Sequence, residues 1–144
     1  MAAQQLIDEH IKAFNDHNAQ AWASHYTPDA MVHDPQYPEP LRGREAIQKD
    51  VEDFLSAFPD MQFTVTNTLV SGDRGAVEGL GAGTHRGPMA VPGGTIPATN
   101  RQAKVPFVAM IQFDSSGLIS EERRYYDVAG MMQQLGLMPE APAA

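Results

Sequence analysis

The chain has 144 residues, of which 42% are hydrophobic, no cysteine, and a formal net charge of −8 at neutral pH. This length suits one domain with a substantial hydrophobic core. The negative charge argues against binding to nucleic acid or to an anionic membrane surface, because both would repel it. We find no apolar run long enough to span a membrane and no secretory leader at the N-terminus, so we expect a soluble, cytoplasmic protein.

Apolar side chains recur at helical spacing in the first part of the chain, and prolines interrupt the pattern. Asp34 and Pro35 follow a short apolar run that predicts a strand. The predicted elements are helices over 4–15 and 19–26, a strand over 30–33, an irregular segment over 36–42 and a helix over 43–57.

After residue 60 the apolar pattern changes to a period of two, which predicts strands. Four glycines of one parity, at positions 75, 79, 81 and 83, indicate a sheet that bends strongly. Helices followed by antiparallel strands predict an α+β fold in which N-terminal helices pack on one face of a curved, mostly antiparallel sheet. The predicted elements are strands over 63–71, 75–85, 104–113 and 118–127 and a helix over 128–135.

The most informative position is Asp127, where the last strand passes into the last helix. Period-two alternation from Ile119 places Asp127 on one face with Glu121, Arg123 and Tyr125. If that face lines a cavity, its ionisable groups are candidates for catalysis. Alternatively, Asp127 only caps the following helix, because aspartate is a favoured N-cap residue.

Several segments resemble one known group. They are Gly-Thr-His-Arg-Gly at 83–87, Ile-Pro-Ala-Thr-Asn-Arg at 96–101, Gly-Leu-Ile-Ser-Glu at 117–121, Asp127, and Met-Met-Gln-Gln-Leu-Gly at 131–136. Over nearly the whole chain the sequence is similar to the SnoaL-like polyketide cyclase branch of the nuclear transport factor 2-like superfamily. The resemblance implies a cone-shaped α+β barrel with an internal pocket and a homodimer formed through the convex face of the sheet. It also implies that an aspartate at the position of Asp127 acts as general acid and base in aldol ring closure without a cofactor.

The chain departs from that branch at two places. Arg123 stands where the cyclases have a tryptophan, and the strand over 104–113 lacks their histidine. A second, N-terminal resemblance is to ketosteroid isomerase, around His-Asp-Pro at 33–35 and the segment 38–47. It implies that Asp34 is a base that moves a proton beside a carbonyl group. The isomerase also needs a tyrosine and a protonated aspartic acid as oxyanion donors, but their positions are occupied here by His10 and about Ala109, so this chain lacks that oxyanion hole.

These arguments yield two sets of candidate site residues. We expect the catalytic groups to be Asp127, His85, Arg123 and Asp34. We expect the pocket wall to contain His10, Phe14, Trp22, His33, Phe54, Phe107, Met110 and Tyr125. The five histidines show no metal-binding spacing, so we predict no metal site. The resemblance to the cyclases implies that no cofactor is needed.

We therefore predict a cofactor-free acid–base enzyme, a cyclase or isomerase, that acts on an apolar carbonyl compound such as a polyketide. Two alternatives remain: an epoxide hydrolase-like activity using Arg123 and Asp127, and a non-catalytic binding or dimerisation module. We expect Asp127 to lie deeper in the pocket than Asp34. The predicted domain spans 1–137, followed by a frayed tail over 138–144.

Overall fold

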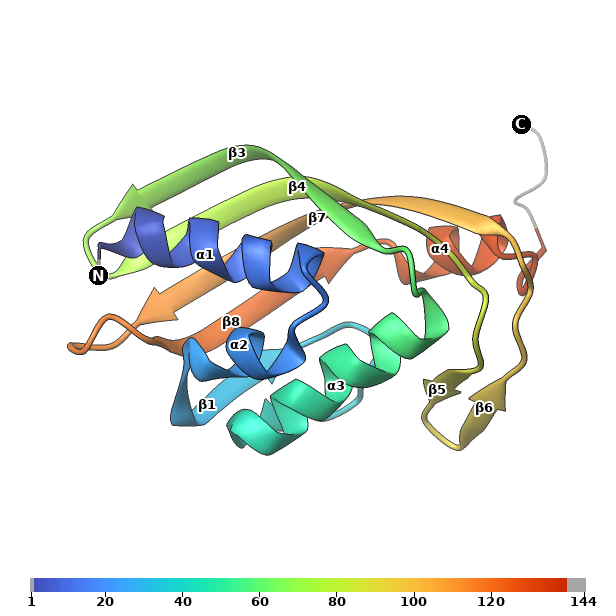
Figure 1. The fold of residues 1–144 in the computed structure, drawn as a ribbon, viewed down its shortest axis with the longest axis horizontal. Coiled ribbons are helices and arrows are strands. Elements are labelled where there is room, and N and C mark those ends of the chain that lie inside the picture. The colour runs from blue at the N-terminus through green and yellow to red at the C-terminus, as the bar shows by residue number, and fades with distance from the viewer. Residues whose placement is uncertain (1, 140–144) are drawn as a thin grey trace.

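Four helices and eight strands occupy residues 2–139, the part of the chain that this computed structural model describes (Figure 1). The helices are α1 (Ala3–Asn15), α2 (Ala19–Ser24), α3 (Gly43–Ala57) and α4 (Val128–Gln134). The strands are β1 (Tyr26–His33), β2 (Leu41–Arg42), β3 (Gln62–Ser71), β4 (Arg74–Thr84), β5 (Met89–Val91), β6 (Gly94–Ile96), β7 (Gln102–Phe113) and β8 (Ile119–Tyr126).

Six strands form one sheet in the order β2-β1-β8-β7-β4-β3, and β5 pairs with β6 in a separate hairpin. β1 runs parallel to β8, whereas all other neighbouring strands of the sheet are antiparallel. The sheet curves over α1, α2 and α3, which all lie on its concave side (Figure 1). The predicted α+β fold with helices on a curved, mostly antiparallel sheet is confirmed.

Each N-terminal helix turns its apolar stripe toward the sheet, as the sequence pattern predicts. In α1, Leu6, Ile7 and Phe14 are each 2% exposed. In α3, Ile47 is fully buried and Val51 is 3% exposed. Burying one such side chain contributes about 1.5–3 kcal/mol, so these stripes hold the helices against the concave face.

The glycines of β4 allow the close approach that the sequence suggests. A Cβ atom added at Gly79 would lie 2.6 Å from the carbonyl oxygen of Thr64 and 2.9 Å from the ring of Phe107. Both distances are below those of real contacts, so only glycine fits there without a shift of the neighbours.

Two local predictions about the chain path are wrong. The second helix ends at Ser24, and Tyr26 already begins β1. The β5–β6 hairpin was not predicted, because its short glycine-rich segments carry no clear alternation. Of the expected frayed tail, residues 140–144 lie outside the described part of the chain.

Candidate active site

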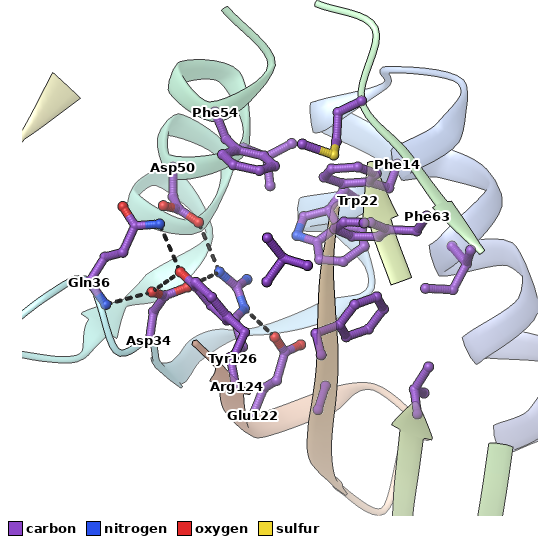
Figure 2. Close-up of a pocket in the computed structure, with 18 of the residues that line it drawn as sticks. Phe14, Trp22, Asp34, Gln36, Asp50, Phe54, Phe63, Glu122, Arg124 and Tyr126 are labelled. Atoms are coloured by element: carbon purple, nitrogen blue, oxygen red, sulfur yellow. Dashed lines mark hydrogen bonds and ion pairs between the residues drawn. The ribbon is translucent and has the colours of Figure 1, made fainter. Parts of the chain in front are cut away.

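A cavity of about 150 Å³ lies between the helices and the concave face of the sheet. Most of its wall is apolar, and aromatic rings dominate one side, among them Phe14, Trp22 and Phe63 (Figure 2). Phe14 and Phe63 stack with ring centroids 3.8 Å apart and nearly parallel planes. The cavity therefore suits an apolar guest with a flat or ring-shaped body.

The opposite side of the cavity is strongly polar and is organised around Arg124 of β8 (Figure 2). Its Nη1 donates to Asp34 Oδ2 at 3.1 Å and to Asp50 Oδ2 at 3.0 Å, while its Nε donates to Glu122 Oε2 at 2.5 Å. Burial disfavours the charged guanidinium, but the charges of Glu122, Asp50 and Asp34 outweigh it and raise the pKa of Arg124 well above its usual value. Three carboxyl groups thus share one permanent cation.

Each of the three carboxyl groups also accepts a tyrosine hydroxyl at 2.6 Å: Asp34 from Tyr126, Asp50 from Tyr37, and Glu122 from Tyr26. Burial, and next the negative charge of the partner carboxylate, raise the pKa of each tyrosine. The hydroxyls therefore remain protonated and act as fixed donors.

Gln36 completes the environment of Asp34. Its backbone N–H donates to Asp34 Oδ1 at 2.9 Å, and its side-chain amide donates to the hydroxyl oxygen of Tyr126 at 2.8 Å. As a result, Asp34 Oδ1 accepts two hydrogen bonds, whereas Oδ2 accepts one within residues 2–139, from Arg124.

Two buried donors of the cavity wall have no hydrogen-bond partner within residues 2–139: Trp22 Nε1 and Arg124 Nη2. Leaving a buried N–H without a hydrogen bond costs roughly 1–3 kcal/mol, so an unpaired buried donor needs an explanation, such as a bound ligand or water. These two donors could bind an oxygen atom of a guest molecule.

The structure places several predicted pocket residues in the cavity wall. His10, Phe14, Trp22, Phe54 and Phe107 all line it, as does the candidate catalytic residue Asp34. The side chain of Asp34 is only 6% exposed.

The predicted location of Asp127 in the cavity is wrong. Asp127 is exposed and is the N-cap of α4, where its Oδ1 accepts the backbone N–H of Gly130 at 2.8 Å. The expected depth order is therefore reversed, with Asp34 inside the cavity and Asp127 outside. The alternative interpretation of Asp127 as a helix cap matches its geometry.

The error arises from a β-bulge near Ser120. Phe113 of β7 pairs with Ile119, but the preceding residue, Gln112, pairs with Glu121, so β8 advances two residues while β7 advances one. The alternation therefore reverses, so Glu122 lies on the same side of β8 as the buried Ile119 and lines the cavity.

The composition of β8 hides this reversal. Its residues 121–126 are three doublets, Glu-Glu, Arg-Arg and Tyr-Tyr, so both faces carry the same residue types in the same order. No hydrophobic contrast identifies the buried face. The only available signal is Ser120, a small polar residue between Ile119 and the doublets, and it is weak.

Five other predicted site residues also lie outside the cavity wall: Arg123, Tyr125, Met110, His33 and His85. Arg123 and Tyr125 point to the convex face, where Tyr125 is 57% exposed, and Met110 is 43% exposed on the same face. His33 contacts Glu121 at 3.3 Å and borders a second pocket that is more open to solvent than the cavity.

His85 is fully buried beside Phe58, and its Nδ1 lies 3.1 Å from the hydroxyl of Thr99. It does not line the cavity. Its close contacts with residues 99–101, which include backbone hydrogen bonds to Asn100 and Arg101, tie the end of β4 to the segment before β7.

Sequence reasoning missed Asp50, Glu122, Arg124 and Tyr126 altogether. Asp50 lies on α3 and the other three on β8, so only the folded chain brings them to Asp34. Chemically, the cluster offers carboxylates for proton transfer, a guanidinium for a developing negative charge, and hydroxyls that orient both. Within residues 2–139, no three His, Cys, Asp or Glu side chains are grouped to hold a metal ion.

None of the helices in the described residues has the length and apolarity needed to cross a bilayer. Among curated proteins, none matches the chain by sequence. Solved structures, by contrast, match across most of its length.

IdmH from Streptomyces antibioticus, whose proposed activity is that of a polyketide cyclase, shares 27% identity at a TM-score of 0.75, with 94% of this chain and 99% of IdmH covered. AclR from Streptomyces galilaeus, a proposed hydroxylase, shares 23% sequence identity at a TM-score of 0.79, with 97% of this chain and 88% of AclR covered. SalBIII is described as an epoxide hydrolase/cyclase-like enzyme in pyran ring formation in salinomycin. It shares 15% sequence identity at a TM-score of 0.73, with 89% of this chain and 92% of SalBIII covered. The family model of SnoaL-like polyketide cyclases matches residues 4–135, and the chain therefore belongs to that family.

Proposed function

We propose that the protein is an enzyme that transfers protons on an apolar, carbonyl-bearing small molecule, in an aldol-type ring closure or an isomerisation. The observation that carries this proposal is the cluster of Asp34, Asp50 and Glu122 around Arg124 in a largely apolar cavity. A structural ion pair needs one carboxylate for one guanidinium. Additional buried carboxyl groups cost free energy, and such an excess is typical of active sites.

In this proposal, Asp34 is the base that removes a proton next to the carbonyl group. Its Oδ2 keeps a free lone pair beside the cavity, because only Arg124 Nη1 contacts it. The hydrogen bonds from Tyr126 and Gln36 to Oδ1 hold the carboxylate in one orientation. The unpaired N–H groups of Arg124 and Trp22 would donate hydrogen bonds to the enolate oxygen, so its negative charge would develop next to fixed donors.

The cavity volume narrows the substrate class. A volume of about 150 Å³ holds roughly one six-membered ring. A multi-ring polyketide would therefore place its reacting ring inside and the rest of the molecule toward the mouth. The proposed proton transfers use side chains alone and need no cofactor.

Hydrogen exchange next to a carbonyl tests this function without knowledge of the natural substrate. Monocyclic apolar ketones would be incubated with the protein in D₂O and followed by NMR. We expect enzyme-dependent deuterium uptake, reduced about 10²-fold or more in Asp34→Asn. The control is Asp29→Asn, an exposed aspartate of β1, the strand that ends just before Asp34; this variant should exchange at the wild-type rate.

Equal exchange in wild type and Asp34→Asn would reject Asp34 as the base. No exchange with any ketone, together with thermal stabilisation by apolar ligands, would favour the non-catalytic binding module. The open cavity is itself an argument against a purely structural domain with a filled cone.

One feature of the cluster favours epoxide opening as a second candidate. Asp34 and Asp50 contact the same nitrogen of Arg124 at 3.1 and 3.0 Å, an aspartate–arginine–aspartate arrangement. One carboxylate could activate water while the other carboxyl group protonates the epoxide oxygen. Incorporation of ¹⁸O from labelled water into a diol, lost in both Asp34→Asn and Asp50→Asn, would identify this activity.

A further inference from the structure

A continuous line of hydrogen bonds runs from the surface to the polar side of the cavity. His25 Nδ1 lies 2.8 Å from His10 Nδ1, and His10 Nε2 lies 3.1 Å from the hydroxyl of Tyr26. The Tyr26 hydroxyl donates to Glu122 Oε1 at 2.6 Å. His25 is partly exposed, whereas His10, Tyr26 and Glu122 are at most 3% exposed.

The chemistry of the last group sets the direction of every bond in this line. The carboxylate of Glu122 can only accept, so the single hydroxyl hydrogen of Tyr26 points to it. Tyr26 must then accept from His10 Nε2–H, and neutral His10, with one N–H, must accept at Nδ1 from His25 Nδ1–H. Burial, the nearby His25 and Arg124 lower the pKa of His10 well below its usual value, which keeps its ring neutral.

We propose that His25, His10, Tyr26 and Glu122 form a proton relay between solvent and the cavity; this inference rests on the proposed function, in which buried carboxyl groups change protonation. A proton that binds His25 Nε2 releases the Nδ1 proton to His10 Nδ1. His10 passes its Nε2 proton to the Tyr26 oxygen, and Tyr26 passes its hydroxyl proton to Glu122 Oε1. His25, His10 and Tyr26 each gain and lose one proton, so only Glu122 changes charge, from carboxylate to carboxylic acid. The reverse sequence carries a proton out.

The surroundings suit this role at both ends and in the middle. Glu122 borders the cavity, and Arg124 Nε holds its other oxygen, so the inner terminus is fixed beside the proposed substrate. The ring of His10 stacks on Trp22 with centroids 3.4 Å apart, which keeps both ring nitrogens aimed at their neighbours. At the outer end, the negative charge of Glu9 favours a proton on His25, although burial lowers the pKa of His25 overall.

The tautomers can be observed directly, without a substrate. Long-range ¹H–¹⁵N NMR on the labelled protein should show His10 neutral and protonated at Nε2 between about pH 5.5 and 8. Tyr26→Phe removes the acceptor of that N–H and should increase the Nδ1–H form. Tyr37→Phe is the matched control, because Tyr37 also donates to a cavity carboxylate but does not contact His10. A cationic His10 at pH 7, or an Nδ1–H tautomer in the wild type, would overturn the relay.

Ketone exchange then tests whether the relay carries protons. Exchange depends on the relay if Glu122 returns a solvent-derived proton or deuteron to the carbon from which Asp34 removed one. His25→Phe should then lower the exchange rate about 10-fold in dilute buffer, and added imidazole should restore it by supplying protons directly. His33→Phe is the control, because His33 is similarly half-buried beside a glutamate but lies outside the cavity. An unchanged rate in His25→Phe, or a loss that imidazole does not restore, would overturn the relay. If the wild type exchanges no ketone, the proposed function fails, and the NMR result alone decides whether the relay exists.

Discussion

Arg123 and Arg124 are neighbours in sequence and opposites in environment. The side chain of Arg124 is 15% exposed and contacts three carboxylates, whereas that of Arg123 is 49% exposed and contacts only Glu121, at 3.3 Å. Removing one partner from a buried charge cluster leaves uncompensated charges, which costs far more than the loss of a surface ion pair.

We therefore expect Arg124→Met to lower the free energy of unfolding by about 3–5 kcal/mol, because Asp34, Asp50 and Glu122 lose their shared cation. The matched variant Arg123→Met should lose at most about 1 kcal/mol. Urea unfolding monitored by circular dichroism measures both. Similar losses in the two variants would contradict the assignment of Arg124 as the organising charge of the cavity.

At the scale of elements, the N-terminus of α4 depends on one side chain. Asp127 accepts the backbone N–H of Gly130, and its own backbone carbonyl accepts the N–H of Met131. Asparagine can make the same side-chain bond through its amide oxygen, but alanine cannot.

Asp127→Ala should cost about 1 kcal/mol of stability, and Asp127→Asn considerably less, since only alanine removes the cap. Neither change should affect ketone exchange, because Asp127 lies outside the cavity. Thermal unfolding and the exchange assay measure the two effects separately. A stable Asp127→Asn variant without exchange activity would restore the sequence-based hypothesis that Asp127 is the acid–base residue.

β4 provides a second prediction at this scale, because its glycines permit close packing. Gly79→Ala should destabilise the protein by about 1–3 kcal/mol, since the new methyl group would meet the Thr64 carbonyl and the Phe107 ring. Gly94→Ala in β6 is the control: a Cβ atom there meets nothing within 4 Å, and we expect a change within about 0.5 kcal/mol. Equal midpoints of denaturation for the two variants would count against steric restriction at Gly79.

At the scale of the whole molecule, the convex face of the sheet carries an exposed apolar group. Strand register aligns Arg123, Met110, Ala76 and Leu69 across four strands, and Tyr125 lies on the same face. Leu69 is 63%, Tyr125 57% and Met110 43% exposed. Clustered apolar side chains of this kind are typical of surfaces that bind a partner.

We propose that this face joins two copies of the chain, as the family resemblance implies. Light scattering at micromolar concentration should give twice the mass of one chain for the wild type. Tyr125→Glu, which adds a charge to the face, should shift the mass toward that of one chain. Gln20→Glu adds the same charge to an exposed position of α2 and should leave the mass unchanged. A wild-type mass of one chain would reject the dimer.

Local signals predicted much of the fold. The third helix was predicted with its observed bounds because its apolar stripe ends just before Pro59, and the turn before β8 follows from Gly117, whose φ is +85°. Tyr26 was assigned to a helix instead of β1, and an inner member of the proposed relay was missed with it. Short elements contain too few residues to establish a period, which is why α2, β5 and β6 were the least predictable.

The sequence by itself determined the fold class, the family and an apolar cavity wall that includes Phe14, Trp22 and Phe107, because these depend on periodicity and motifs along the chain. Only the tertiary structure decided which face of β8 is buried. The doublets make its two faces equivalent in composition, and the bulge that selects one of them depends on pairing with β7. The convergence of Asp34, Asp50 and Arg124, which are separated by up to 90 positions, likewise depends on strand register and helix packing, which no local pattern encodes.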